Sequence, residues 1–104
     1  MTPRRGEIWW GEEPDEGGRP YLVLTRDAAI GVLNRLLVAP VTRTIRGIPT
    51  QVPLGPREGL PTECVASFDN LQPFSKARLT HRMGSIDVAR SAEVCAALRA
   101  AVDC

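Results

Sequence analysis

The chain has 104 residues and a mass of 11.3 kDa, which is enough for one domain with one hydrophobic core. Its 13 Lys and Arg residues nearly balance 12 Asp and Glu residues, so the total charge by itself points to no partner. A single His excludes a two-imidazole acid–base pair and a His-rich metal site. The composition thus offers no set of imidazole ligands for a metal ion, and no cofactor is expected.

Cysteine usage and hydropathy predict a cytoplasmic protein. Cys64, Cys95 and Cys104 have no C-x-x-C spacing, and any disulfide scheme leaves one of them unpaired. This pattern is typical of free thiols in a reducing compartment. No apolar run approaches the roughly 18 residues of a membrane span, and the N-terminus lacks the apolar segment of a signal peptide. We expect residues 1–104 to form a single domain with no membrane partner.

Charge is distributed unevenly along the chain. From Glu7 to Gly18 there are five acids and no base, whereas from Arg19 to Arg46 there are five arginines and only Asp27 as an acid. Arg outnumbers Lys twelve to one, which favours bidentate contacts with phosphate or carboxylate groups. A genome rich in arginine codons and an ordinary solvated surface would give the same composition.

Short apolar segments between Gly and Pro residues predict a chain made mainly of strands. The predicted strands cover residues 7–10, 20–25, 36–41, 49–54, 63–68 and 82–86. Pro40 marks a bulge or an edge position, and the prolines around 49–54 indicate an edge strand. An exposed acidic loop is expected over 11–18, and a brief helical turn around 75–78.

Only the C-terminal segment has helical periodicity. Its apolar residues recur every three or four positions and form one stripe, consisting of Val88, Ala92, Cys95, Leu98 and Val102. Asp87 or Ser91 is placed to cap the helix. Strands followed by one helix predict an α+β, mainly β fold, a small β-barrel with a C-terminal helix. Such a small core would be stabilised by dimerisation.

Four segments of the chain carry motifs that occur together in one known family. They are Arg5-Gly6-Glu7-Ile8-Trp9-Trp10 with Arg19-Pro20-Tyr21-Leu22-Val23-Leu24, Val38-Ala39-Pro40-Val41-Thr42, the region 65–79 with Asp69-Asn70-Leu71, and Leu79-Thr80 with Gly84-Ser85-Ile86 before the final helix. In this order and spacing the chain resembles the MazF/PemK family of toxin endoribonucleases. The resemblance covers essentially all of the sequence.

The resemblance implies an SH3-like barrel that forms a homodimer and cuts single-stranded RNA in a sequence-specific way without a metal. The RNA's own 2′-hydroxyl attacks the phosphorus, which leaves a 2′,3′-cyclic phosphate and a 5′-hydroxyl. The family further implies a type II toxin–antitoxin system that inhibits translation and growth. A MazE-like antitoxin with a disordered acidic tail is the expected partner, and operator DNA would be bound only by the toxin–antitoxin complex.

The family pattern pairs an Arg and a Thr as catalytic residues, and they match Arg19 and Thr42. A guanidinium group at residue 19 can bind two phosphoryl oxygens and stabilise the charge of the transition state. The hydroxyl of Thr42 can hold the reacting phosphate in line. The alternatives are a surface Arg that neutralises the acidic segment and a Thr chosen for strand propensity. Thr44, on the same face as Thr42, is a rival for its role.

Further residues are expected to bind RNA. Trp9 and Trp10 point to opposite faces of one strand; one should be core, and the other can stack on a base. The predicted RNA-binding set is Trp10, Gly18, Arg26, Arg43, Thr44 and Arg46. The segment 11–18 is unusually acidic for the family and can act as a gate, and Gln72 stands where a basic residue is common.

Two other functions are compatible with the same motifs. A CcdB-like toxin poisons gyrase by docking on it and cleaves no RNA. A non-catalytic SH3-like module would bind RNA in a salt-dependent way and leave it intact. The presence of Arg19 together with Thr42 favours the ribonuclease.

Overall fold

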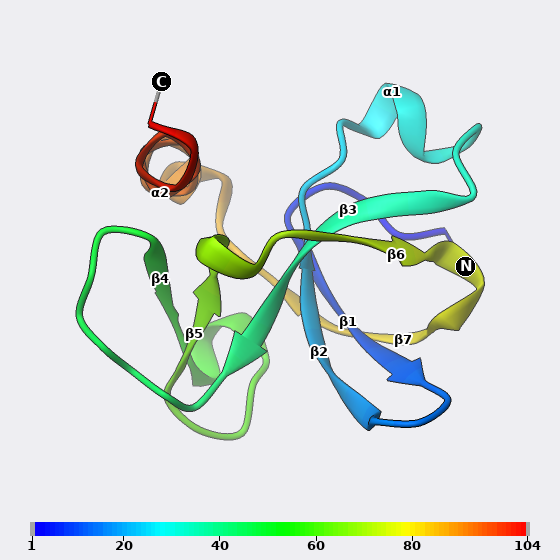
Figure 1. Cartoon of the computed structure of the whole chain (residues 1–104), viewed down its shortest axis with the longest axis horizontal. Coiled ribbons are helices and arrows are strands. Elements are labelled where there is room, and N and C mark those ends of the chain that lie inside the picture. The colour runs from blue at the N-terminus through cyan, green and yellow to red at the C-terminus, as the bar shows by residue number, and fades with distance from the viewer. Residues whose placement is uncertain (1, 104) are drawn as a thin grey trace.

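The strands of the sheet lie in the order β4-β5-β3-β2-β1-β7, and β6 pairs separately with β3 (Figure 1). This computed structural model describes residues 2–103. The strands are β1 (Glu7–Glu13), β2 (Gly17–Val23), β3 (Arg35–Thr42), β4 (Gln51–Leu54), β5 (Cys64–Ser67), β6 (Gln72–Ser75) and β7 (Leu79–Ser85), and the α-helices are α1 (Asp27–Ile30) and α2 (Ser91–Val102). This mainly β, curled half-barrel with a C-terminal helix confirms the predicted fold class.

Strand β3 changes its partner at Pro40. Residues 35–38 pair with β6, whereas Val41 and Thr42 pair with β5. Proline has no N–H to contribute to a ladder, so it fits between the two paired segments. The predicted bulge or edge at Pro40 is therefore a change of partner strand. Because β3 turns toward β5 here, its last residues separate from β2, with which pairing ends at Tyr21 and Pro40.

Both faces of the sheet are buried, because alternate residues of the central strands pack into two separate clusters. Leu22 of β2 belongs to the cluster that α2 covers through Val94. Its neighbour Tyr21 belongs to the other cluster, with Phe74 of β6. Trp9 is 2% exposed and lies in this second cluster, which confirms that one of the two adjacent tryptophans is a core residue.

The acidic segment 11–18 is mostly strand. β1 continues to Glu13 and β2 begins at Gly17, which leaves only the turn 14–16 between them. The prediction of a loop over the whole of 11–18 was therefore wrong in its extent. A hairpin ladder runs through this segment, and backbone hydrogen bonds can extend a hairpin beyond its apolar residues. Hydropathy does not carry that signal.

Two short elements were not predicted from the sequence. Strand β6 pairs with the first half of β3 and contains Pro73, a residue that usually interrupts strand patterns. Helix α1 has four residues, too few for a helical period to be visible. The 3-10 turn at Lys76–Arg78 confirms the helical turn expected around 75–78.

Helix α2 packs with a face that matches the predicted one only in part. The helix follows a 3-10 turn at Val88–Arg90, which Asp87 caps by accepting a hydrogen bond from the Ala89 N–H. Its buried and partly buried residues are Val94, Cys95, Ala97, Leu98 and Ala101. The predicted stripe was correct at Cys95 and Leu98, which are partly buried, and wrong at the exposed Val88, Ala92 and Val102. Neither helix in the described part of the chain has the length and apolar character that a membrane crossing needs.

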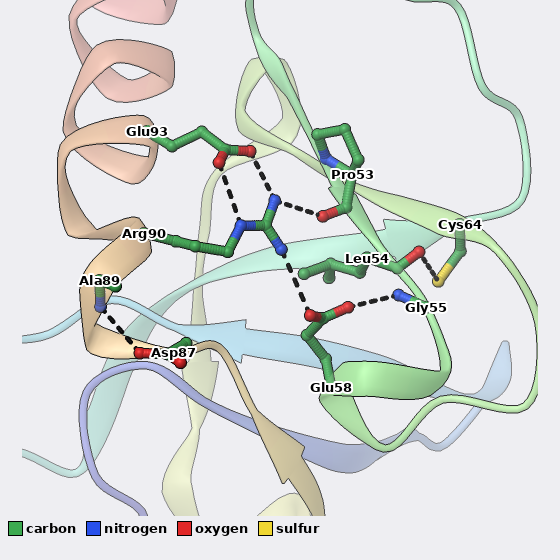
Figure 2. Close-up of polar contacts among 9 residues, drawn as sticks. All are labelled: Pro53, Leu54, Gly55, Glu58, Cys64, Asp87, Ala89, Arg90 and Glu93. Atoms are coloured by element: carbon green, nitrogen blue, oxygen red, sulfur yellow. Dashed lines mark hydrogen bonds and ion pairs between the residues drawn. The ribbon is translucent and has the colours of Figure 1, made fainter.

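A network of charged groups fixes how α2 sits on the sheet (Figure 2). The Arg90 guanidinium donates to the Glu93 carboxylate, with Nε–Oε1 at 3.0 Å, and to the Pro53 carbonyl at 2.8 Å. The guanidinium also donates to one carboxylate oxygen of Glu58 at 3.4 Å. The other carboxylate oxygen of Glu58, a residue that is only 8% exposed, accepts the Gly55 N–H at 2.7 Å. The hydrogen bond from Arg90 lowers the pKa of Glu93. The network therefore joins the start of α2 to the end of β4.

Replacing Arg90 should destabilise the fold. Arg90→Met keeps the length of the side chain but leaves the Glu58 carboxylate buried without its cation. We expect the free energy of unfolding, measured with urea at pH 7, to fall by about 1–3 kcal/mol. Arg99→Met, on the exposed side of the same helix, is the control and should change it by less than about 0.5 kcal/mol. Equal losses in both variants would contradict the role of the network.

Candidate functional site

Arg19 and Thr42 lie at the end of the molecule where β2 and β3 separate. Tyr21 pairs with Pro40 and Leu22 with Ala39. Arg19 lies two residues before Tyr21 and Thr42 two residues after Pro40, so in this antiparallel pair both lie just beyond the last paired residues, at the same end. Because β3 has turned toward β5 at this point, a hollow opens on either side of β2. We call them the Arg19 hollow and the Trp10 hollow.

The Arg19 hollow has a volume of about 470 Å³ and combines one cation with carboxylate, amide and aromatic groups. Its lining consists of Glu13, Glu16, Arg19, Tyr21, Pro40, Asp69, Asn70, Leu71 and Gln72. The Asp69 carboxylate accepts a hydrogen bond from the Thr50 hydroxyl at 2.7 Å. The acidic hairpin therefore does stand beside Arg19, with Glu13 and Glu16 facing the same space.

Tyr21 contributes to the core and to the Arg19 hollow at once. Its ring packs on Phe74, with ring centroids 4.4 Å apart. Burial raises the pKa of the Tyr21 phenol; the charge of Arg19 acts in the opposite direction, and Glu13 and Glu16 raise the pKa further. The phenol is therefore protonated at neutral pH. From the sequence Tyr21 is only an apolar strand residue, although its position two residues after Arg19 predicts the same face of β2.

The Trp10 hollow lies on the other face of β2 and has a volume of about 160 Å³. Its lining consists of Trp10, Pro20, Val41, Thr42, Arg43, Leu60, Pro61, Thr62, Cys64 and Met83. The half-buried indole of Trp10 stacks on His81, with ring centroids 6.3 Å apart and planes 18° apart. Its Nε1–H donates to Glu12 at 3.3 Å. Thr42 and the Trp10 indole, on which an RNA base is predicted to stack, thus border one hollow. Arg19 borders the other.

Gly18 lies directly beneath the Trp10 indole. A Cβ atom at this position would come within 2.4 Å of Trp10 Cζ2. The absence of a side chain at Gly18 therefore allows the indole to lie flat on β2. The sequence predicts Gly18 as an RNA-binding residue. In the structure Gly18 lies against the Trp10 indole and leaves room for it.

The segment after β3 is tied down by hydrogen bonds. The Thr44 N–H donates to the Thr42 hydroxyl oxygen at 3.1 Å. The side chain of Gln51 joins two points of the same segment, because its amide donates to the Thr44 carbonyl and accepts the Arg46 N–H. Arg43 lines the Trp10 hollow, and Arg46 is exposed farther along the segment. Thr42 therefore borders the Trp10 hollow, whereas the backbone N–H of Thr44 orients the Thr42 hydroxyl.

Arg26 lies apart from the other predicted site residues. It directly precedes α1 and follows the end of β2, whereas Arg19 lies near the start of that strand. Figure 1 shows α1 at the top of the view and the β1–β2 hairpin at the bottom. Of the predicted RNA-binding residues, Arg26 therefore lies away from the end of β2 that borders the two hollows.

Cys64 lies in the wall of the Trp10 hollow. Burial raises the pKa of this thiol, Glu58 raises it further, and Arg43 acts in the opposite direction. It is therefore a neutral thiol at neutral pH rather than a nucleophile. Cys95 is half-buried, and Cys104 lies outside the described part of the chain. Within residues 2–103 no three His, Cys, Asp or Glu side chains are grouped to hold a metal ion.

Comparison with known proteins identifies the family. The model of a family described as "PemK-like, MazF-like toxin of type II toxin-antitoxin system" matches residues 4–102. The chain belongs to this family. The resemblance that the four sequence motifs predicted is thereby confirmed, and the matched residues include β1, β2 and β3, which carry the two hollows.

Named relatives and solved structures agree with this membership of the PemK/MazF family. The chain is 45% identical over 103 residues to "Probable endoribonuclease MazF5" of Mycobacterium tuberculosis, covering 98% of this chain and 94% of the relative. The structure of "Mycobacterium tuberculosis toxin MazF-mt6" superposes with a TM-score of 0.87 at 31% identity, covering 93% of this chain and 96% of that one. An "Endoribonuclease in complex with its cognate antitoxin from Mycobacterial species" has a TM-score of 0.85 at 28% identity, covering 97% and 95%.

The contact between Gly18 and Trp10 can be tested in this PemK/MazF-family chain by adding one methyl group. Gly18→Ala should displace the indole, because the new Cβ cannot coexist with it at 2.4 Å. We expect acrylamide to quench tryptophan fluorescence more strongly in this variant, since Trp9 is buried in both proteins. Gly31→Ala, where a Cβ meets no atom within 4 Å, is the control. Unchanged quenching in Gly18→Ala would show that the position of the Trp10 indole does not depend on this glycine.

Proposed function

We propose that this chain is a cytoplasmic toxin that acts as a metal-independent, sequence-specific endoribonuclease on single-stranded RNA and so inhibits translation and growth. The observation that supports the proposal is the position of Arg19 and Thr42, each two residues beyond the last β2–β3 pair, with Thr42 sharing a hollow with Trp10 and Arg19 bordering the adjacent hollow. The names of the relatives, as endoribonucleases, support the same activity. The domain spanning 1–104 carries the whole site in this proposal.

Arg19 stabilises charge in the proposed reaction. The 2′-oxygen forms a bond to phosphorus as the bond to the 5′-oxygen breaks, and extra negative charge collects on the non-bridging oxygens. A guanidinium group can donate to two of these oxygens at once. Donors directed at developing charge are often the largest single catalytic contribution. Arg19 can also deliver a proton to the departing 5′-oxygen, as a second role.

Thr42 positions the phosphate. Its oxygen already accepts the Thr44 N–H at 3.1 Å, so its own hydrogen is directed elsewhere and is free for donation. A phosphoryl oxygen above the strand end can accept it, which would hold the phosphorus in line for attack. The same contact favours Thr42 over Thr44 as the catalytic hydroxyl, because Thr44 contributes through its backbone.

Trp10 holds the RNA strand beside the reacting phosphate. A base stacked on an aromatic side chain contributes about 1–3 kcal/mol, and it does so for every kind of base. Arg43 shares the hollow with Trp10, and Arg46 follows on the same segment. An RNA strand that crosses the end of β2 would therefore meet a base platform on one face and Arg19 on the other.

We also propose the partners of this chain. A homodimer would enlarge the small core, as the sequence predicts. The antitoxin is expected to silence the toxin by laying an acidic, disordered segment on the exposed charges of Arg43 and Arg46. Relatives crystallised as "MazE-MazF" from Deinococcus radiodurans support an antitoxin of this kind. Operator DNA would be bound only by the toxin–antitoxin complex.

Removal of either catalytic group should slow RNA cleavage strongly. We expect Arg19→Ala and Thr42→Ala each to lower kcat by about 10²–10³-fold, because each removes one contact to the reacting phosphate. Thr44→Ala keeps the backbone N–H that orients Thr42 and should retain most activity. Arg35→Ala, on the exposed first residue of β3, is the control for charge loss. Near-native cleavage by Arg19→Ala or Thr42→Ala would remove that residue from the site.

The ends of the RNA fragments test the proposed chemistry. Cleavage of a mixed-sequence RNA in EDTA should proceed at the rate seen without EDTA and give 2′,3′-cyclic phosphate and 5′-hydroxyl ends. The products can be identified by mass spectrometry. Salt-dependent binding with intact RNA would indicate the non-catalytic module instead, and inhibition of gyrase without RNA cleavage would indicate the CcdB-like function.

A further inference from the structure

We propose that the hydroxyl of Tyr21 is a further RNA-contacting group, which donates a hydrogen bond to an oxygen of the phosphate that Arg19 binds. This inference rests on the proposed cleavage of RNA at Arg19. The motifs that point to Arg19 and Thr42 assign no role to Tyr21, which the sequence presents as one residue of an apolar strand.

The ring of Tyr21 is held in a fixed position by the fold. Its backbone lies between two paired strands, opposite Trp9 on one side and Pro40 on the other. The ring packs on Phe74 at 4.4 Å between centroids, and the planes are tilted by 33°. At Gly11 a Cβ atom would come within 2.8 Å of both rings, so the backbone of β1 lies close against them. The direction of the hydroxyl is therefore set before any ligand arrives.

The hydroxyl is directed into the Arg19 hollow without a partner. Tyr21 is only 4% exposed and yet lines this hollow. Among the described residues neither a side chain nor the backbone forms a hydrogen bond with its oxygen, and no fully buried side-chain oxygen or nitrogen lacks a partner. The small accessible part of Tyr21 must therefore include its hydroxyl oxygen. A nearly buried donor left open toward a hollow is an unusual arrangement in a folded protein.

The position of the hydroxyl suits a ligand that Arg19 also holds. Residues two apart on one strand point to the same face and are separated by about 7 Å. Hydrogen bonds of about 2.8 Å on either side of a phosphate can span that gap. Phosphate oxygens only accept hydrogen bonds, and a protonated phenol can donate one. Because Glu13, Glu16 and Asp69 line the same hollow, a phosphate there requires donors in addition to Arg19.

Removal of the hydroxyl alone tests the inference. Tyr21→Phe keeps the ring on Phe74 and takes away only the proposed donor. We expect kcat/KM for RNA cleavage to fall about 10- to 100-fold, the range for a lost hydrogen bond to a charged group. Thermal stability should stay unchanged, because the hydroxyl has no partner within the fold. Ser91→Ala removes a hydroxyl on α2, far along the chain from the site, and should leave cleavage unchanged.

A spectroscopic probe reports on the contact directly. Tyr21 is the only tyrosine in the chain, so incorporation of 3-fluorotyrosine gives a single ¹⁹F resonance next to the hydroxyl. We expect this resonance to shift when a mixed-sequence 2′-O-methyl RNA, which cannot be cleaved by 2′-hydroxyl attack, is added to saturation. The same addition to the fluorinated Arg19→Gln variant should give a smaller shift, because the phosphate would be held less firmly there.

The outcomes separate this inference from the proposed function. Cleavage by the wild type together with unchanged kcat/KM in Tyr21→Phe would overturn the role of Tyr21 and leave the ribonuclease intact. A ¹⁹F resonance that does not move at saturating RNA would overturn it as well. Absence of RNA cleavage by the wild type would overturn the proposed function and this inference together. The inference stands only if the rate falls and the resonance moves.

Discussion

Strand β2 is hydrogen-bonded on both sides, and the arrangement of the site depends on this double pairing. Pairing with β1 and β3 fixes which way each of its side chains points. Arg19 and Tyr21 then face one hollow, and Pro20 faces the other. The pairing with β3 stops where that strand turns to β5, and the hollows open at this point. A shift of one residue in register would exchange the two faces.

Glycine residues let aromatic rings lie against the hairpin backbone. Gly18 leaves room for the Trp10 indole, and Gly11 leaves room for the rings of Tyr21 and Phe74. These two glycines stand on the two strands of the same hairpin. The flat backbone they provide explains how two large side chains can be placed on opposite faces within so short a segment.

Much of the fold was predictable from the sequence, because buried strands leave a local hydropathy pattern. The core strands around Leu22 and Val65 were found in this way. The hairpin over 11–18 was not, since it is held by backbone hydrogen bonds between polar residues. The face of α2 was also assigned only in part. Two overlapping apolar stripes fit that helix, and the choice between them depends on long-range contacts such as Arg90 with Glu58.

For the candidate site, the sequence predicted which types of residue take part but not where in the fold they lie. Arg19 and Thr42 both border the end where β2 and β3 separate, because β3 pairs with β5 after Pro40. Arg26 has the same chemistry as Arg19 but lies at the opposite end of β2, which composition cannot reveal. Tyr21 could not be recognised as a site residue from the sequence, because it stands within a run of apolar strand residues. What distinguishes its hydroxyl is that Tyr21 lines the Arg19 hollow, and this hollow exists only in the folded structure.

The alternation of side chains along β2 also affects how such toxins can diverge. Residues 20 and 21 are neighbours in the sequence, yet they border different hollows. A substitution at one position can therefore alter one surface and leave the lining of the other unchanged. The linings of the two hollows can thus vary separately through changes in adjacent codons.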